Sequence, residues 1–225
     1  MASTRLVEKG KETTTKILEW LYLFKYSKCS ILQDITGLSR SGIGDALKKL
    51  EKRGLLKSLK PTPPLKTVWG ITWDGICHIG KTEESHKFEP SKFNELTAIH
   101  HYNIQQLKII LSRKGYNLIP LKRDSVGSSE KTPDGIIKKE NTTIAIELER
   151  TVKTKSRYKN IWGGYIKDIR NGKYHQIQYF MPNQRTQNLP KIFNMTETII
   201  IDNKSLRFTD ELKSFFRFTD ISDKV

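Results

Sequence analysis

The sequence has few cysteines, no long apolar run and a shortage of acidic residues. Cys29 and Cys77 are the only cysteines in 225 residues, which excludes a four-cysteine metal site. No apolar run approaches the ~18 residues that a membrane-spanning helix requires. The N-terminal residues lack the apolar segment of a signal peptide, so we expect a cytoplasmic protein with reduced thiols and no membrane partner.

Basic residues greatly outnumber acidic ones. The chain has 40 Lys and Arg against 24 Asp and Glu, a formal net charge of +16. With 36% hydrophobic and 9% aromatic residues it has enough apolar side chains to fold, which excludes a disordered polyelectrolyte. A folded, strongly basic protein points to an acidic macromolecular partner, and nucleic acid is the simplest. A basic enzyme without such a partner is the alternative.

The first third of the chain predicts three helices followed by two strands. Apolar residues recur at helical spacing over residues 13–24, and residues 30–36 predict a short second helix. Ser39 is placed to cap a third helix. Residues 55–59 and 67–71 are strand-like, and the prolines between them preclude regular pairing in the connecting loop.

The order and the residues of these elements resemble a bacterial winged-helix domain. Residues 38–43 and 47–55 look like its recognition helix, and residues 69–75 like the return strand of the wing and the turn into the next helix. The resemblance covers residues 13–80 and implies binding to duplex DNA, with protein docking as the alternative. We expect DNA contacts from Ser39, Arg40, Ser41, Lys48, Lys52 and, in the loop between the strands, Lys66.

The rest of the chain alternates helices and strands after a polar stretch at residues 81–85. We therefore divide it into a winged-helix domain, residues 1–84, and a second domain, residues 85–225, with a mixed central sheet and an α+β or α/β fold. The expected helices are 93–114, 155–171 and 189–193, and the expected strands are 116–121, 133–137, 143–149, 176–180 and 198–202. The expected buried face of helix 93–114 is Leu96, Ile99, Ile104, Leu107 and Leu111.

Three carboxylates gather in the hairpin of this second domain. Glu147 and Glu149 are two residues apart on one strand and therefore point to the same face, and a bend at Asp134 brings a third carboxylate beside them. Three like charges repel unless a cation lies between them, and Mg²⁺ or Mn²⁺ prefers such hard oxygen ligands. The alternative is an exposed strand whose alternating glutamates pair with nearby Lys or Arg.

The order helix, strand, hairpin with Pro-Asp and Glu-x-Glu, basic helix and strand resembles the core of PD-(D/E)xK nucleases, a restriction-endonuclease-like fold. The resemblance implies that Asp134 and Glu147 are metal ligands and that both are catalytic. Glu149 stands where the family usually has lysine, so it joins the acidic site and Lys153 or Lys155 supplies the positive group. A decayed site that binds DNA without cutting it is the alternative.

Nine Lys and Arg (153, 155, 157, 159, 167, 170, 173, 185 and 191) lie between residues 151 and 191, against one acid, Asp168. Lys155 and Arg157 are expected to hold phosphates beside the carboxylates, and Tyr158 to stack on an unpaired base if the duplex is locally melted. A solvated basic helix whose aromatic side chains face the core is the alternative interpretation, and it fits Trp162 and Tyr165.

Taken together, the two halves are similar to MobC-type plasmid mobilisation proteins, relaxases related to the replication-relaxation family. The similarity includes residues 99–103, 133–135 and 147–151 and spans residues 13–182. It implies recognition and metal-dependent nicking of an origin of transfer, with accessory mobilisation proteins and a coupling protein as partners. The alternatives are a winged-helix replication or transcription regulator with an inactive nuclease-like domain, and a restriction-type endonuclease. His100 and His101 diverge by about 100° on a helix, so we expect a core hydrogen bond or a phosphate contact from one of them.

Overall fold

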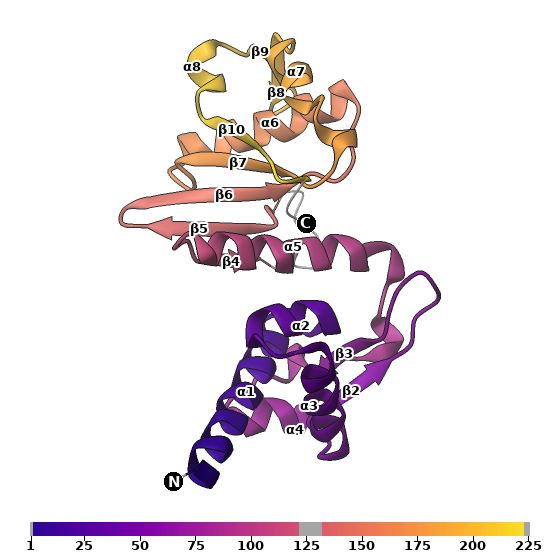
Figure 1. The fold of residues 1–225 in the computed structure, drawn as a ribbon. Helices are drawn as coiled ribbons and strands as arrows, with labels where there is room; N and C mark the ends of the chain where they lie inside the picture. Colours follow the sequence, from indigo (N-terminus) through magenta and orange to yellow (C-terminus); the bar gives the residue numbers. More distant parts are fainter. Residues whose placement is uncertain (1, 122–131, 223–225) are drawn as a thin grey trace. The chain divides into compact units, whose positions relative to one another are not determined.

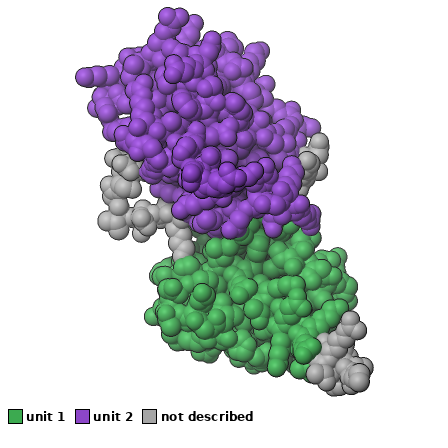
Figure 2. All heavy atoms as spheres, turned by 90° about the vertical axis from the view of Figure 1, so that its left-hand side faces the viewer, with its two compact units in different colours: residues 1–109 green, residues 110–225 purple. Residues whose placement is uncertain are grey.

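The computed structural model describes residues 2–121 and 132–222. The chain divides into two compact units, residues 1–109 and residues 110–225 (Figure 2). The boundary expected after residue 84 lies inside the first unit. The fold is mixed: the described residues form eight α-helices and ten strands, with a mixed five-stranded sheet in the second unit (Figure 1).

Three helices open unit 1, as the sequence predicted, but the first is longer than expected. They are α1 (Ala2–Phe24), α2 (Cys29–Thr36) and α3 (Arg40–Lys52). Gly37 ends α2 in the left-handed conformation, with φ at 68°. The Ser39 hydroxyl accepts a hydrogen bond from the Gly42 amide and caps α3. The helices enclose a core that includes Ile17, Leu21, Ile43 and Leu47.

A small antiparallel sheet closes unit 1. It consists of β1 (Tyr26–Lys28), β2 (Leu56–Leu59) and β3 (Val68–Ile71) in the order β1-β3-β2. The two longer strands were predicted, whereas β1 was not, because three residues are too few to show alternation. The Gly70 backbone lies against the Phe88 ring, and a Cβ at Gly70 would come within 2.1 Å of it.

The remaining elements of unit 1 lead into a long helix. They are α4 (Trp73–His78), the 3₁₀ turns Glu84–His86 and Pro90–Lys92, and α5 (Glu95–Arg113), which continues into unit 2. The expected buried face of α5 is wrong at its start, because Leu96 is 88% exposed and Ile99 is 43% exposed. Instead Ala98, Tyr102 and Gln105 are buried.

Buried hydrogen bonds explain this rotation of α5. The side-chain oxygen of Gln105, Oε1, accepts from the Trp20 indole at 2.8 Å and from the Ser27 hydroxyl at 2.6 Å. The side-chain nitrogen of Gln105, Nε2, donates to the Tyr26 backbone carbonyl at 3.0 Å. A buried polar group costs free energy unless it is paired, so the side of α5 that carries Gln105 must face its partners. Leu96 and Ile99 then lie outside the contact.

The sheet of unit 2 is mixed. It contains β4 (Leu118–Pro120), β5 (Gly135–Lys139), β6 (Thr142–Leu148), β7 (Gln176–Met181) and β10 (Phe216–Asp220), in the order β10-β7-β6-β5-β4. The first three strands are antiparallel neighbours, and β7 runs parallel to both β6 and β10. Helix α6 (Lys155–Arg170) makes the crossover from β6 to β7. A parallel pair requires such a connection.

Short elements complete unit 2. They are the 3₁₀ turn Gln184–Thr186, α7 (Leu189–Asn194), the hairpin of β8 (Thr198–Ile201) and β9 (Lys204–Arg207), and α8 (Asp210–Lys213). Figure 1 shows α6, α7 and this hairpin on the same side of the five-stranded sheet. An aromatic core fills that side and includes Tyr158, Trp162, Phe193 and Phe208. Gly163 lets α6 approach β8, since a Cβ there would lie 1.8 Å from the Ile200 carbonyl oxygen.

Candidate functional site

The predicted carboxylates converge where the β5–β6 hairpin ends. Gly135 pairs with Ile146, so the next positions along the hairpin set Asp134 opposite Glu147. Directly opposed residues of an antiparallel pair share a face. The Asp134 carboxylate also accepts a hydrogen bond from the Leu148 amide at 2.8 Å, which fixes it beside β6. The structure therefore brings together the two residues expected to be metal ligands.

Glu147 and Glu149 are buried, not on an open strand face. Their exposed fractions are 7% and 4%. The Tyr165 hydroxyl donates to a Glu147 carboxylate oxygen, and the Lys153 ammonium donates to both oxygens of Glu149. Hydrogen bonds from a buried hydroxyl and from an ammonium group make it possible to bury these carboxylates. Of the two lysines expected to supply a positive group, Lys153 reaches the acidic residues.

Three buried tyrosines surround these carboxylates. Burial raises the pKa of Tyr165 and Tyr179 well above the usual value, and the negative charge of Glu147 raises both further. Burial also raises the pKa of Tyr158, to which the charge of Glu149 adds. All three rings therefore stay neutral at physiological pH and keep their hydroxyl protons.

Tyr158 cannot take the role expected for it. Its side chain has no exposed surface, and its ring stacks on Trp162 with 4.8 Å between centroids and 10° between planes. The hydroxyl accepts a hydrogen bond from the Lys153 amide at 3.2 Å. A base cannot reach this ring, because the core of unit 2 already covers it. Tyr158 instead supports the segment that carries Lys153.

Comparisons with protein-family models, with curated proteins and with solved structures found no match.

Of the three predicted carboxylates, Asp134 and Glu147 fit a hard divalent cation, as a pair of ligands. Across residues 2–121 and 132–222, no group of three or more His, Cys, Asp or Glu side chains is arranged to hold a metal ion. Asp134 and Glu147 still offer carboxylate oxygens from adjacent strands, which is the ligand type that Mg²⁺ and Mn²⁺ prefer. Glu149 is already engaged by Lys153.

The basic residues expected next to the carboxylates lie at the start of α6. The Thr154 hydroxyl caps the helix by accepting from the Arg157 amide. Lys155 and Arg157 are exposed. The Lys155 ammonium donates to the Met195 carbonyl at 3.2 Å, so it points toward α7 and not toward Glu149. Arg157 is exposed on the first turn, where a phosphate could reach it.

The residues expected to contact DNA in unit 1 are all on its surface. Arg40, Ser41, Lys48 and Lys52 are exposed on α3, and Lys66 is exposed in the loop between β2 and β3. Ser39 is also exposed, but its hydroxyl is occupied by the α3 cap and lies 3.2 Å from the Ser41 hydroxyl. Its contribution is therefore to hold the first turn of α3.

His101 has a core role, one of the two roles expected for this histidine pair. Its Nε2 lies 3.2 Å from the Tyr26 carbonyl oxygen, and its ring packs on Tyr26 and edge-on to Phe24. This desolvation lowers the pKa of His101 to about 4.

The hydrogen bond between Tyr165 and Glu147 could not be predicted from the sequence. Tyr165 is expected in the core as an aromatic residue of a basic helix, and its ring is buried. Its hydroxyl reaches a carboxylate eighteen positions earlier in the chain only because α6 folds back over β6.

No described helix combines the length and the apolar character needed to cross a bilayer.

Proposed function

We propose that this protein binds DNA through α3 and the β2–β3 loop and nicks it, with a divalent cation, at the carboxylates of unit 2. In unit 1 the order α1, β1, α2, α3, β2 and β3, with β2 and β3 antiparallel, supports a winged helix. The exposed cations of α3 and Lys66 support a DNA-binding role for it. A formal charge of +16 favours such a partner.

The path of the chain in unit 2 supports a nuclease-like domain. Helix α5, strand β4, the β5–β6 hairpin, α6 and the parallel strand β7 follow one another in the order of the PD-(D/E)xK core. The observation that carries the proposal is the position of Asp134 opposite Glu147, held by the Leu148 amide at the end of that hairpin. The resemblance to MobC-type relaxases makes an origin of transfer the first substrate to test.

Each residue of the site has a role in the proposal. Asp134 and Glu147 would hold Mg²⁺ or Mn²⁺, which when bound supplies Lewis-acid activation of a water molecule and of the scissile phosphate. Tyr165 orients Glu147 by its hydrogen bond. Lys153, one quarter exposed, neutralises Glu149. Arg157 would hold the neighbouring phosphate.

One observation favours a second candidate, a DNA-binding regulator that does not cut. All three carboxylates already accept hydrogen bonds from the protein, and Glu149 forms an ion pair where the nuclease pattern has lysine. A site satisfied internally needs no cation for its stability. Binding without chemistry would then be the whole function of the chain.

Supercoiled plasmid carrying candidate origins, incubated with the full chain and Mg²⁺ or Mn²⁺, separates these functions. We expect open circles nicked at one site. Intact plasmid that nevertheless binds the protein would favour the regulator, and linear product would favour a restriction-type endonuclease. Incubation with EDTA is the control, because it removes the divalent cation without altering the protein.

A further inference from the structure

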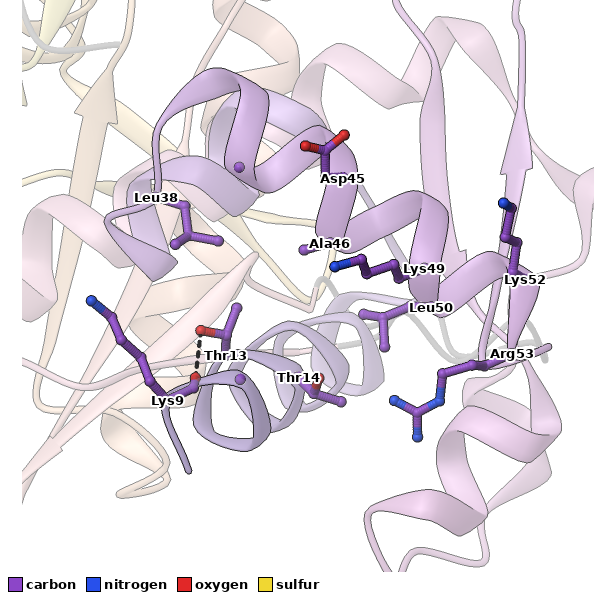
Figure 3. A pocket seen from close by; sticks show the side chains of 12 residues that line it. Lys9, Thr13, Thr14, Leu38, Asp45, Ala46, Lys49, Leu50, Lys52 and Arg53 are labelled. Atoms are coloured by element: carbon purple, nitrogen blue, oxygen red, sulfur yellow. Dashed lines mark hydrogen bonds between the residues drawn. The ribbon is translucent and has the colours of Figure 1, made fainter. Parts of the chain in front are cut away.

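A groove between α1 and α3 shares only Lys52 with the residues proposed to contact DNA or the cation. It encloses about 680 Å³ and lies within unit 1. Its floor consists of the side chains of Leu38, Ala46 and Leu50. Figure 3 shows Thr13 and Thr14 of α1 on one side of it and Lys49 of α3 on the other.

The groove exists because small residues line it on both helices. Gly10 lies on α1, and a Cβ added there would meet no atom within 4 Å. Gly42 lies on the facing part of α3. Neither residue offers a side chain to cover the apolar floor. Along α3 the groove runs from Gly42 to Arg53, which is about 16 Å or three helical turns.

The rim of the groove is strongly basic. Four cations line it against a single acid, Asp45, so its formal charge is +3. An apolar floor with a cationic rim complements a chain that presents apolar side chains flanked by carboxylates. The four cations are Lys9, Lys49, Lys52 and Arg53.

Duplex DNA on α3 would cover only the Lys52 edge of this groove. Successive residues of a helix are about 100° apart, so Lys48 and Lys49 point to different sides of α3. Lys49 shares its side with Gly42, Ala46 and Arg53, the groove residues. A phosphate backbone also offers nothing apolar to Leu38 or Ala46, and Asp45 would repel it.

From this geometry we propose that the α1–α3 groove docks a helical segment of a partner protein that is apolar on one face and acidic beside it. The segment lies along α3 and spans about three turns. Its apolar side chains, spaced three and four residues apart, contact Leu38, Ala46 and Leu50. Its carboxylates pair with Lys49, Arg53 and Lys9. This docking does not depend on DNA binding by the outward face of α3.

The probe is a synthetic peptide of about 14 residues, with leucines on one helical face and glutamates elsewhere. A scrambled peptide of the same composition is the control for charge alone. Binding to the full chain is measured by fluorescence anisotropy at about 0.15 M salt, where long-range attraction is screened. We expect the scrambled peptide to bind at least about tenfold more weakly.

Matched variants locate the site. Gly10→Trp adds a large ring at a position where a Cβ meets no atom within 4 Å, and we expect it to weaken peptide binding about tenfold while leaving DNA affinity unchanged. Lys49→Glu is expected to act in the same way on the peptide. Lys48→Glu, one residue away on the outward face, should keep peptide affinity within about twofold and weaken a DNA duplex.

Two results would overturn the proposal. One is equal affinity for the ordered and scrambled peptides. The other is displacement of the peptide by duplex DNA, with Lys49→Glu and Lys48→Glu weakening DNA equally, which would assign the groove to nucleic acid. Absence of DNA binding by the wild-type chain would contradict the proposed function and leave the docking result standing.

Discussion

At the scale of single residues, the carboxylates of unit 2 differ in what holds them. Asp134 is fixed by a backbone amide, Glu147 by a neutral tyrosine and Glu149 by an ammonium group. In the proposed function the cation goes to Asp134 and Glu147, because their carboxylates come from opposed positions of adjacent strands. Glu149 forms an ion pair with Lys153, which we expect to stabilise the fold.

Asp134→Asn tests the first assignment. The amide oxygen can still accept from the Leu148 amide, so the fold is expected to persist while the negative charge is lost. We expect Mn²⁺ binding, measured by calorimetry, and plasmid nicking to be lost, with DNA affinity unchanged or higher. Glu140→Gln in the exposed hairpin turn is the matched control and should alter neither. Nicking by Asp134→Asn at the wild-type rate would remove Asp134 from the site.

Exchanging the charges of Glu149 and Lys153 tests the second assignment. Glu149→Lys alone sets two ammonium groups together at a position that is 4% exposed. We expect the free energy of unfolding to fall by about 3 kcal/mol in urea titrations. Nicking should also fall, because a positive charge beside Glu147 repels the cation.

The double variant Glu149→Lys with Lys153→Glu should recover part of this stability, since it restores opposite charges. No recovery would show that the pair does not stabilise the fold. Higher activity in the single variant would mean that this position works best with the lysine of the nuclease pattern.

At the scale of elements, α3 and α6 each combine a packing face with a cationic face. On α3, Ile43, Leu47 and Leu50 are buried while Arg40 and Lys48 are exposed. On α6, the buried face is aromatic, and Gly163 on it lies against the β8 backbone. Amphipathic periodicity makes such a division possible, because it gathers buried residues on one side and leaves charge on the other.

The exposed cations of α3 give a DNA-binding prediction. Arg40→Ala should reduce discrimination between specific and unrelated duplexes by about 1–3 kcal/mol if its side chain reads a base. Lys48→Ala should weaken all duplexes alike and lower the salt slope of binding by about 1 if its side chain contacts a phosphate. Anisotropy titrations at several salt concentrations measure both effects, and Asp134→Asn serves as the control.

The contact between α6 and β8 gives a stability prediction. A Cβ at Gly163 would lie 1.8 Å from a backbone carbonyl oxygen, which cannot rotate away, so Gly163→Ala must push the helix from the hairpin. We expect a loss of about 3 kcal/mol in the free energy of unfolding. Gly164→Ala is the matched control, since a Cβ there meets nothing within 4 Å and alanine favours the helix. Equal effects of the two substitutions would contradict the close packing of α6 on β8.

At the scale of the whole molecule, a buried polar network holds the start of α5 within unit 1. Gln105 joins Trp20, Ser27 and Tyr26, and His101 meets the same Tyr26 carbonyl. Each of these polar groups has its hydrogen-bond partner within the network. The contact therefore depends on particular partners and not on apolar burial alone. It also makes the stability of the molecule sensitive to pH.

The pH dependence follows from His101. Its pKa is about 4 in the fold and 6.5 when unperturbed, so between these values the unfolded chain binds a proton that the folded chain does not. Stability is therefore fully present above about pH 6.5 and falls as pH drops toward 4, by up to roughly 3 kcal/mol. Urea titrations at several pH values measure this loss. His101→Gln is expected to flatten the profile, and an unchanged profile would show that other groups cause the dependence.

Local order could be predicted from the sequence because its causes are local. Ser39 as a cap, Gly37 as a helix end and the pairing of β5 with β6 each depend on neighbouring residues, and the structure has them all. Apolar periodicity likewise predicted the helix over residues 13–24, which lies in α1. The opposition of Asp134 and Glu147 also follows from the hairpin alone.

Tertiary structure decided which helix faces are buried and which side chains contact the carboxylates. Leu96 is exposed because Gln105 turns the other side of α5 inward, and Tyr158 is buried because α6 folds back over β6. Strands β9 and β10 were not predicted from the sequence. Strand β10 pairs with β7, which is distant in sequence, and β9 is a short polar strand that pairs with β8 in a hairpin. Tyr165 reaches Glu147 only across that crossover. Propensity and spacing act over a few residues, whereas burial and pairing depend on contacts between segments far apart in the chain, and those contacts form only when the whole unit folds.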